Sequence, residues 1–286
     1  MADNHTSDTT RSSPLTPLAR LDAWMADHPW HPRIIPFVVY LSFLALILPA
    51  RDWHPLTYPL LYSLQCGLVL YLLWRYRRLL PELTLSFHWL AVPVGVGVCV
   101  AWVVIGKWMV SLAPNDLGDP GYDFFEKMNP TLAWTSVSLR LLGMSIVVPM
   151  FEELFIRSLC LRSFHRFRRT GVGVLHLLMD LPLLGEWLIH TNWGKRAGRH
   201  PPVFGPVFEK TPLGALSLFG VAASTFVFMM SHANRDKPAA IVCGVAYCLL
   251  LWATRKKGLG PVIWAHGITN ALLWVYTLAY ADWRFL

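Results

Sequence analysis

Three groups of polar residues lie inside apolar stretches of the sequence, and their types suit the hydrolysis of an amide bond. Glu152 and Glu153 are neighbours in one stretch, His232 closes a second, and His266 and Asn270 lie in a third. A carboxylate or an imidazole can take a proton from water, while imidazole and amide groups can donate hydrogen bonds to a developing oxyanion. Ionisable groups are costly inside a membrane and are therefore functional candidates.

The spacing around the two carboxylates predicts different tasks for them. Glu153 and Arg157 are four residues apart, so their side chains can meet on one face of a helix. The residue four positions after Glu152 is Ile156, which offers no cation. We therefore expect Glu153 to be ion-paired and structural, and Glu152 to be free to act as a general base. The alternative interpretation is that this segment is the end of a helix at the level of the lipid headgroups, where Glu153 and Arg157 form an ordinary ion pair.

The two histidine motifs also follow helical spacing. Ser224, Phe228 and His232 recur every four residues, which places the Phe228 ring where it can wedge His232 against a neighbouring helix. His266 and Asn270 share a face in the same way. The simpler interpretations are a capping or surface histidine for His232 and a helix–helix hydrogen bond for the other pair.

The composition indicates which elements hold these groups. Of 286 residues, 55% are apolar and 15% are charged, against about 25% charged in soluble domains, and the mean hydropathy is +0.43. Such a chain is too apolar for disorder. The five cysteines are odd in number and widely spaced, without a CxxC pair, so neither a disulfide scaffold nor a zinc motif is indicated. The composition predicts an integral membrane protein.

A helix needs about 20 apolar residues to cross a bilayer, and seven stretches are near that length. We predict an all-α fold, a polytopic transmembrane helical bundle of seven to eight spans. The ambiguous segment is 171–190, which suits the membrane surface or a re-entrant path better than a span. The seven stretches are 34–50, 56–74, 88–112, 132–161, 213–232, 239–254 and 259–281.

The net charge of +8 reflects topology. The basic residues of the chain form short clusters between apolar stretches, as the positive-inside rule predicts for cytoplasmic loops. Because membrane topology explains these clusters, nucleic-acid binding is not expected. The clusters at 75–78, 162–169 and 255–257 are then cytoplasmic, the acidic loop 113–131 lies outside, and the N-terminus is inside. Arg140, three turns before Glu152, either pairs within the bundle or snorkels.

His232 lies about 28 Å from the cytoplasmic edge of its stretch at 1.5 Å per residue, and Glu152 only about 10–15 Å from its own. We therefore expect the first two turns of the fifth helix, from about Pro212, to project into the cytoplasm.

Together, Glu152-Glu153-x-x-x-Arg157, Phe228-x-x-x-His232 and His266-x-x-x-Asn270 resemble the membrane endopeptidases of the CPBP (Abi) family, which includes the type II CAAX prenyl proteases. The resemblance covers about residues 135–280 and implies a helical intramembrane peptidase of the glutamate type. It implies that Glu152 and His232 activate water, that His266 and Asn270 form the oxyanion site, and that Glu153, Arg157 and Phe228 support them. It also implies a membrane-associated protein substrate and no cofactor.

This comparison divides the chain into three parts: a flexible cytoplasmic tail at 1–33 with a short helix around Leu18 to Met25, N-terminal transmembrane helices at 34–131, and a CAAX-protease-like catalytic core at 132–286. The Trp-rich N-terminal helices also resemble the bacterial branch of the family that accompanies exosortase sorting systems. This resemblance predicts the inner (plasma) membrane as the location. The insertion 171–212 is expected to be a lid, a docking surface or a variable loop.

Three other functions remain open at this stage. A zinc variant would use Glu152, His232 and His266 as ligands, although nothing resembles HExxH. A non-enzymatic scaffold or immunity-type protein would use the polar cluster for packing. A transporter is disfavoured because no internal repeat is visible.

Overall fold

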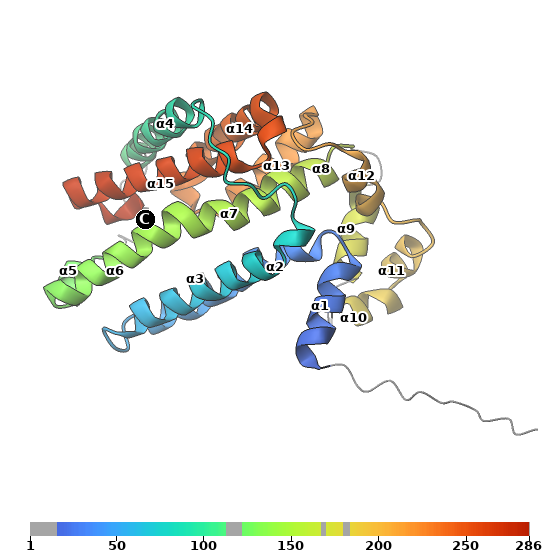
Figure 1. The fold of residues 1–286 in the computed structure, drawn as a ribbon, viewed down its shortest axis with the longest axis horizontal. Helices are drawn as coiled ribbons and strands as arrows, with labels where there is room; N and C mark the ends of the chain where they lie inside the picture. Colours follow the sequence, from blue (N-terminus) through green and yellow to red (C-terminus); the bar gives the residue numbers. More distant parts are fainter. Residues whose placement is uncertain (1–15, 113–121, 167–169, 180–183, 286) are drawn as a thin grey trace, which may run out of the picture.

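The computed structural model describes residues 16–112, 122–166, 170–179 and 184–285, and within these ranges it contains helices and no strand. This confirms the predicted all-α class. The helices form a bundle whose longest members run side by side, with a group of short helices at one end (Figure 1).

The N-terminal part is a helical hairpin with a short helix across its base. Helix α1 is held to the hairpin by an ion pair between Asp22 and Arg75 and by the fully buried Met25. The short helix expected around Leu18 to Met25 corresponds to α1, and the start of α2 also falls within the part assigned to the tail, while residues 1–15 lie outside the described part. The helices are α1 (Pro17–Asp27), α2 (His31–Ala50), α3 (Thr57–Arg75) and the 3-10 turn η1 (Arg77–Leu79).

The stretch that carries Glu152 and Glu153 is one long helical run from Pro130 to Ser163, preceded by the short α5 (Phe124–Lys127). Its start is fixed by Asn129, whose side chain accepts a hydrogen bond from the Leu132 amide, and by proline in the first turn. Two π-helical segments interrupt it, and π-bulges occur frequently at functional sites. The run consists of α6 (Pro130–Leu142), η2 (Gly143–Val147), α7 (Val148–Glu153), η3 (Leu154–Cys160) and α8 (Leu161–Ser163).

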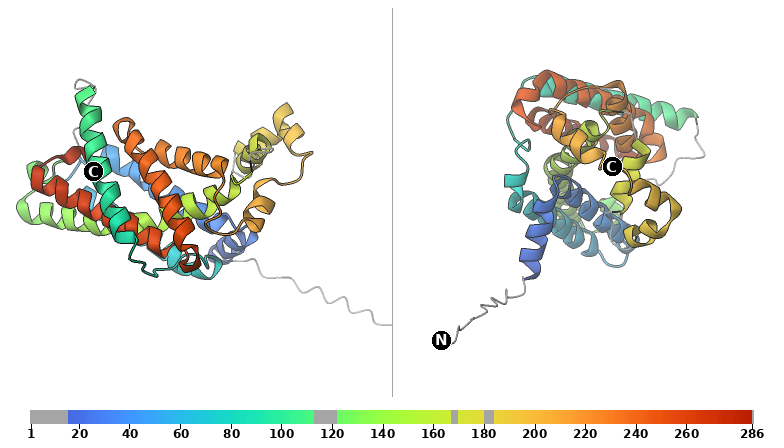
Figure 2. Two further views of the ribbon diagram at one scale, coloured as in Figure 1. Left: turned by 90° about the horizontal axis from the view of Figure 1, so that it is seen from above. Right: turned by 90° about the vertical axis from the view of Figure 1, so that its right-hand side faces the viewer.

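The remaining long helices pack around this run, with α15 against α4, η2 and α7 (Figures 1 and 2). The close approach of α15 to α4 and to η2 depends on glycines. A Cβ at Gly95 would lie 2.6 Å from the Ala265 oxygen, and one at Gly267 would lie 2.5 Å from the Ser145 oxygen. Small residues allow such contacts between membrane helices. The elements are α4 (Ala91–Leu112), α13 (Leu218–Met230), η4 (Asn234–Asp236), α14 (Lys237–Thr254), η5 (Arg255–Lys257), α15 (Gly260–Tyr280) and η6 (Trp283–Phe285).

Four helical segments are long and apolar enough to cross a membrane: His31–Ala50, Ala91–Leu112, Asn234–Lys257 and Gly260–Tyr280. Leu218–Met230 is apolar but shorter. Helix α4 also exposes an apolar stripe at four-residue spacing, as a lipid-facing helix does. The stripe is Val92, Val96, Val100, Val104 and Trp108. Seven to eight spans therefore stays a prediction, of which four are matched by this criterion.

The insertion after α8 folds into four short helices, each of ten residues or fewer. Crossing the bilayer takes about 20 residues, so α9 and α10 are too short to span, as expected for 171–190; residues 180–183 lie outside the described part. The four helices are α9 (Thr170–Met179), α10 (Leu184–His190), α11 (Asn192–Ala197) and α12 (Phe204–Lys210).

The fifth apolar stretch differs from its prediction. Its helix begins at Leu218, capped by the Ser217 side chain, and does not extend back to Pro212. Gly214 adopts a positive φ of 74° in the segment before it. The projecting turns expected from Pro212 are therefore absent from α13, and His232 lies just beyond the end of a helix about 20 Å long at 1.5 Å per residue.

Candidate active site

The two adjacent carboxylates of α7 lie in different environments. Glu153 is completely buried, whereas the side chain of Glu152 is 14% exposed and lines a cavity of about 370 Å³. Because neighbouring residues are about 100° apart around a helix, one carboxylate faces the interior of the bundle and the other faces the cavity.

Glu153 forms the expected ion pair with Arg157. The Arg157 Nε lies 3.2 Å from Glu153 Oε2, and both side chains are 0% exposed. The guanidinium also lies over two aromatic rings, 4.6 Å from the Phe228 centroid and 5.4 Å from that of Tyr247. Attraction of the cation to these rings partly replaces its lost hydration. Phe228 therefore supports the site by stabilising the arginine.

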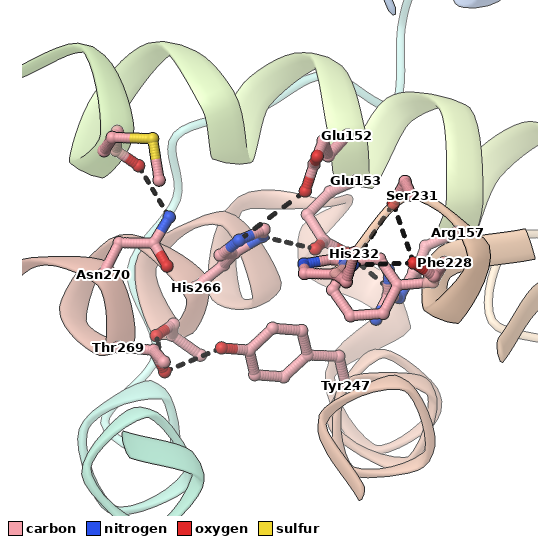
Figure 3. Close-up of polar contacts among 12 residues, drawn as sticks. Glu152, Glu153, Arg157, Phe228, Ser231, His232, Tyr247, His266, Thr269 and Asn270 are labelled. Carbon is pink, nitrogen blue, oxygen red and sulfur yellow. Dashed lines mark hydrogen bonds and ion pairs between the residues drawn. The ribbon is translucent and has the colours of Figure 1, made fainter. Parts of the chain in front are cut away.

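The second oxygen of Glu153 orients His266. His266 Nδ1 lies 2.8 Å from Glu153 Oε1, and its Nε2 lies 3.8 Å from Glu152 Oε2 (Figure 3). A carboxylate accepts hydrogen bonds, so Nδ1 carries the proton of this contact. The opposite nitrogen then faces Glu152 across a gap too long for a direct hydrogen bond.

His232 is held by the end of α13. Its Nδ1 is 2.8 Å from the Phe228 carbonyl oxygen, which can only accept, and 3.3 Å from Ser231 Oγ. The ring also packs against the Phe228 ring at 4.6 Å and the Trp102 ring of α4 at 5.3 Å. The predicted aromatic wedge is therefore present, and the backbone contact leaves Nε2 as the available nitrogen of His232.

Asn270 is tied to the π-helical segment η2. Its Nδ2 donates to the Met144 carbonyl oxygen at 2.7 Å, which uses one of the two amide hydrogens. A separate hydrogen bond of 2.7 Å joins Tyr247 and Thr269, and the Tyr247 ring packs against the His266 ring with centroids 5.5 Å apart. Thr269 in turn contacts the Gly95 carbonyl oxygen at 2.9 Å and so links α14, α15 and α4.

The structure brings the four predicted catalytic residues to one cavity, which Glu152, His232, His266 and Asn270 all line. They come from α7, from the residue pair after α13, and from α15 (Figure 3). In the described part of the chain, no group of three or more His, Cys, Asp or Glu side chains is arranged to hold a metal ion.

Sequence reasoning missed Trp102, Tyr247 and Thr269. Thr269 lies inside the quoted His266–Asn270 motif, three residues after His266, and this helical spacing is a signal that could have pointed to it. Trp102 and Tyr247 reach the site only through the packing of α4 and α14, so no local pattern indicates them.

An all-helical bundle with apolar helices of membrane-spanning length and a buried carboxylate–imidazole cavity has the features of a membrane-embedded hydrolase. Residues 134–272 match the family model of the type II CAAX prenyl endopeptidase Rce1-like proteins, and this part of the chain belongs to that family. The family is one of peptidases, and the chain is an integral membrane protein. All seven predicted site residues fall inside the matched range. No curated protein and no solved structure matches the chain.

Proposed function

We propose that the protein is an intramembrane endopeptidase that uses Glu152 and histidine to activate water against a peptide bond of a membrane-associated protein. The observation that carries the proposal is the shared cavity of Glu152, His232, His266 and Asn270. Membership of residues 134–272 in the Rce1-like family supports the reaction class.

Glu152 is the general base in this mechanism. Its carboxylate takes a proton from water as the water oxygen attacks the scissile carbonyl carbon, and His232 holds the water through Nε2. The same carboxylic acid then returns the proton to the leaving nitrogen as the C–N bond breaks. The partial exposure of Glu152 toward the cavity and the backbone anchor of His232 support these roles.

His266 and Asn270 stabilise the oxyanion in this proposal. Because His266 Nδ1 is engaged by Glu153, its Nε2 can donate a hydrogen bond only when the ring carries two protons. Asn270 contributes the amide hydrogen that Met144 does not use. Glu153 is thus a positioning residue, and Arg157 fixes Glu153 in turn.

We place the protein in a bacterial inner (plasma) membrane with its N-terminus in the cytoplasm. The chain that follows the basic segment 75–78 contacts the basic segment 255–257, because Thr84 and Ser86 donate hydrogen bonds to the Lys257 carbonyl oxygen. A cysteine at Arg78 should resist an impermeant maleimide in intact cells, while one at Asp52, in the turn between α2 and α3, should react. The reverse pattern would overturn this orientation.

Comparative membrane proteomics of cells carrying wild-type protein or the Glu152→Gln variant tests the proposed activity. A Glu186→Gln variant is the matched control, because Glu186 is exposed on α10. We expect one precursor, or a few, to accumulate only with Glu152→Gln, and their sequences to reveal whether the substrates are prenylated or belong to an exosortase sorting system. Unchanged precursors and an intact phenotype would favour the scaffold function.

A further inference from the structure

The insertion that follows α8 forms a lobe at one end of the bundle. The lobe, defined here as α9 to α12, lies at the same end as α1 (Figures 1 and 2). Helices α10 and α11 contact α9 and each other, and His176 Nε2 of α9 lies 2.9 Å from the Ala197 carbonyl oxygen of α11. The mechanism proposed above uses no residue of this lobe.

Small residues are buried in this lobe, and large apolar ones are exposed. A helix that packs on a protein core buries its large apolar side chains. In α10 and α11, however, Trp187 is 65% exposed, Trp193 70% and Ile189 47%. These two helices therefore present apolar surface to a partner outside the lobe. Their buried residues are Gly185, Leu188, Gly194 and Ala197.

Basic residues accompany the two tryptophans. Residues 184–200 contain Lys195, Arg196 and Arg199, all exposed, and one acidic residue, Glu186. Tryptophan is enriched where a membrane meets water, because its ring is apolar and its N–H is polar. Lysine and arginine beside a membrane are attracted to anionic headgroups. The exposed surface of α10 and α11 therefore complements an anionic bilayer surface both in charge and in apolar character.

The length of the preceding helical run places the lobe near the headgroups. From Pro130 to Ser163 the run is about 51 Å long at 1.5 Å per residue, whereas a bilayer measures about 40–45 Å including its headgroups. A run of this length reaches the headgroup layer at its end. Helix α9 begins at Thr170, shortly after that end, so the lobe starts at the membrane surface.

Helix α12 fixes the lobe to the bundle. The ring centroid of Phe208 lies 3.8 Å from the Arg162 guanidinium of α8 and 5.0 Å from the Arg33 guanidinium of α2. Arg162 also donates hydrogen bonds to two carbonyl oxygens at the C-terminal end of α12, at 2.8 and 3.1 Å. Within the lobe, Phe204 of α12 packs against Gly173 of α9, where a Cβ would lie 2.8 Å from the ring. The surface of α10 and α11 therefore has a defined place relative to the membrane helices.

From these observations we infer that the exposed surface of α10 and α11 docks on anionic phospholipids of the membrane that holds the bundle. The rings of Trp187 and Trp193 enter the headgroup layer, and the three basic side chains pair with lipid phosphates. The inference does not depend on the peptidase function, because none of these residues lines the active-site cavity.

Amide hydrogen exchange of the full-length protein in nanodiscs tests this inference. The nanodiscs contain phosphatidylcholine alone or an equimolar mixture with phosphatidylglycerol. Docking opposes the local opening through which these amides exchange, and each basic residue near an anionic surface contributes about fivefold to docking. We expect amides of residues 184–200 to exchange at least ~10-fold more slowly in the mixture, with those of α14 unchanged. Equal rates for residues 184–200 in the two lipids would overturn the inference in favour of a protein partner.

Charge reversal should assign the lipid dependence to the three basic residues. We expect a variant with Lys195→Glu, Arg196→Glu and Arg199→Glu to exchange at rates within about twofold in the two lipids, because its surface no longer attracts phosphate. The control carries the same change of charge at the three exposed basic residues 255–257 and should keep the full difference. A difference that survives the reversal at 195–199 would overturn the assignment.

The tryptophans are tested in the same way. Trp187→Ala combined with Trp193→Ala should speed the exchange of residues 184–200 in both lipids, because the apolar part of docking does not depend on lipid charge. Trp53→Ala is the control, since Trp53 is 79% exposed in the turn between α2 and α3, and it should leave these rates unchanged. Equal rates for the double variant and the wild type would contradict the role given to the two rings.

Salt provides a test on the wild-type chain that holds even if a variant fails to fold. The Debye length is about 10 Å at 0.1 M salt and about 3 Å at 1 M, so the attraction between the lobe and the lipids is screened at the higher concentration. In 1 M NaCl the two lipids should give exchange rates within about twofold of each other. A difference that persists undiminished at 1 M NaCl would overturn the inference.

Discussion

Removing the charge of Glu153 is expected to destabilise the protein, because Arg157 would remain buried without its counterion. At the observed 3.2 Å separation, the attraction is about 5 kcal/mol for an effective dielectric constant of about 20. Breaking a buried pair by removing one partner costs ~3–5 kcal/mol. The Phe228 and Tyr247 rings contact the guanidinium with or without the carboxylate, so their contribution cancels in the comparison. We therefore expect Glu153→Gln to lose about 3 kcal/mol, the lower end of this range.

Thermal unfolding of detergent-solubilised protein measures this loss. Using ~2–4 °C per kcal/mol for a chain of this size, Glu153→Gln should lower the melting temperature by about 6–12 °C. Arg157→Met should cost a similar amount, because it takes the guanidinium away from a buried carboxylate. The double variant should cost less than the sum of the two by at least about 2 kcal/mol, since neither charge remains.

The exposed Glu186→Gln substitution is the control and should leave the melting temperature unchanged. If the two single effects add within about 0.5 kcal/mol in the double variant, the ion pair contributes nothing, and our account of Glu153 and Arg157 as a coupled support for His266 is wrong.

Three further predictions concern the surroundings of the site. Burial alone raises the pKa of Glu82, but hydrogen bonds and attraction from Arg33 and a hydrogen bond from Ser158 lower the pKa below its usual value. The ionised Glu82 carboxylate therefore stabilises the fold fully above the unfolded pKa of about 4.3, and this stabilisation is lost as the pH falls through the pKa of the folded state. Melting temperatures of wild type and Glu82→Gln should converge on acidification from pH 7 to 3, and parallel curves would contradict this. Gly267→Ala should reduce cleavage about 100-fold by shifting His266, because its Cβ would meet the Ser145 oxygen at 2.5 Å, whereas Gly97→Ala, with open space around it, should be neutral; equal activities would show that this packing does not position His266. Cleavage should persist in EDTA and 1,10-phenanthroline, while loss that added zinc restores would assign Glu152, His232 and His266 as metal ligands.

Much of the fold was predictable because hydropathy and length fix where apolar helices lie. The stretches 34–50 and 259–281 correspond to α2 and α15 within a few residues. The Glu153–Arg157 pair was predictable because four-residue spacing brings side chains together on any helix. That pairing also allowed different roles to be predicted for Glu152 and Glu153 without knowledge of any tertiary contact.

The rest depends on contacts between segments distant in sequence. The bond from His266 to Glu153 joins α15 to α7, and no local pattern encodes it. The two π-helical segments that flank α7 were not predicted from the sequence. The late start of α13 was missed because residues 213–217 are as apolar as the helix that follows, so only backbone conformation separates them.

Arg140 shows the same limit. From sequence it was expected to pair within the bundle or to snorkel. In the fold it lies between the rings of Tyr58 and Trp274, shares a hydrogen bond with Tyr58 and lines the cavity, so of the two expectations it is the pairing within the bundle that the structure shows.

The most direct test of the central claim is the cleavage rate of reconstituted Glu152→Gln protein on a precursor identified by proteomics, compared with wild type and Glu186→Gln. If Glu152 is the general base, Glu152→Gln should keep the wild-type melting temperature and lose at least about 100-fold in rate, because general-base catalysis contributes ~10²–10⁴-fold. Glu186→Gln should match wild type. A folded Glu152→Gln protein that cleaves at the wild-type rate would contradict the account.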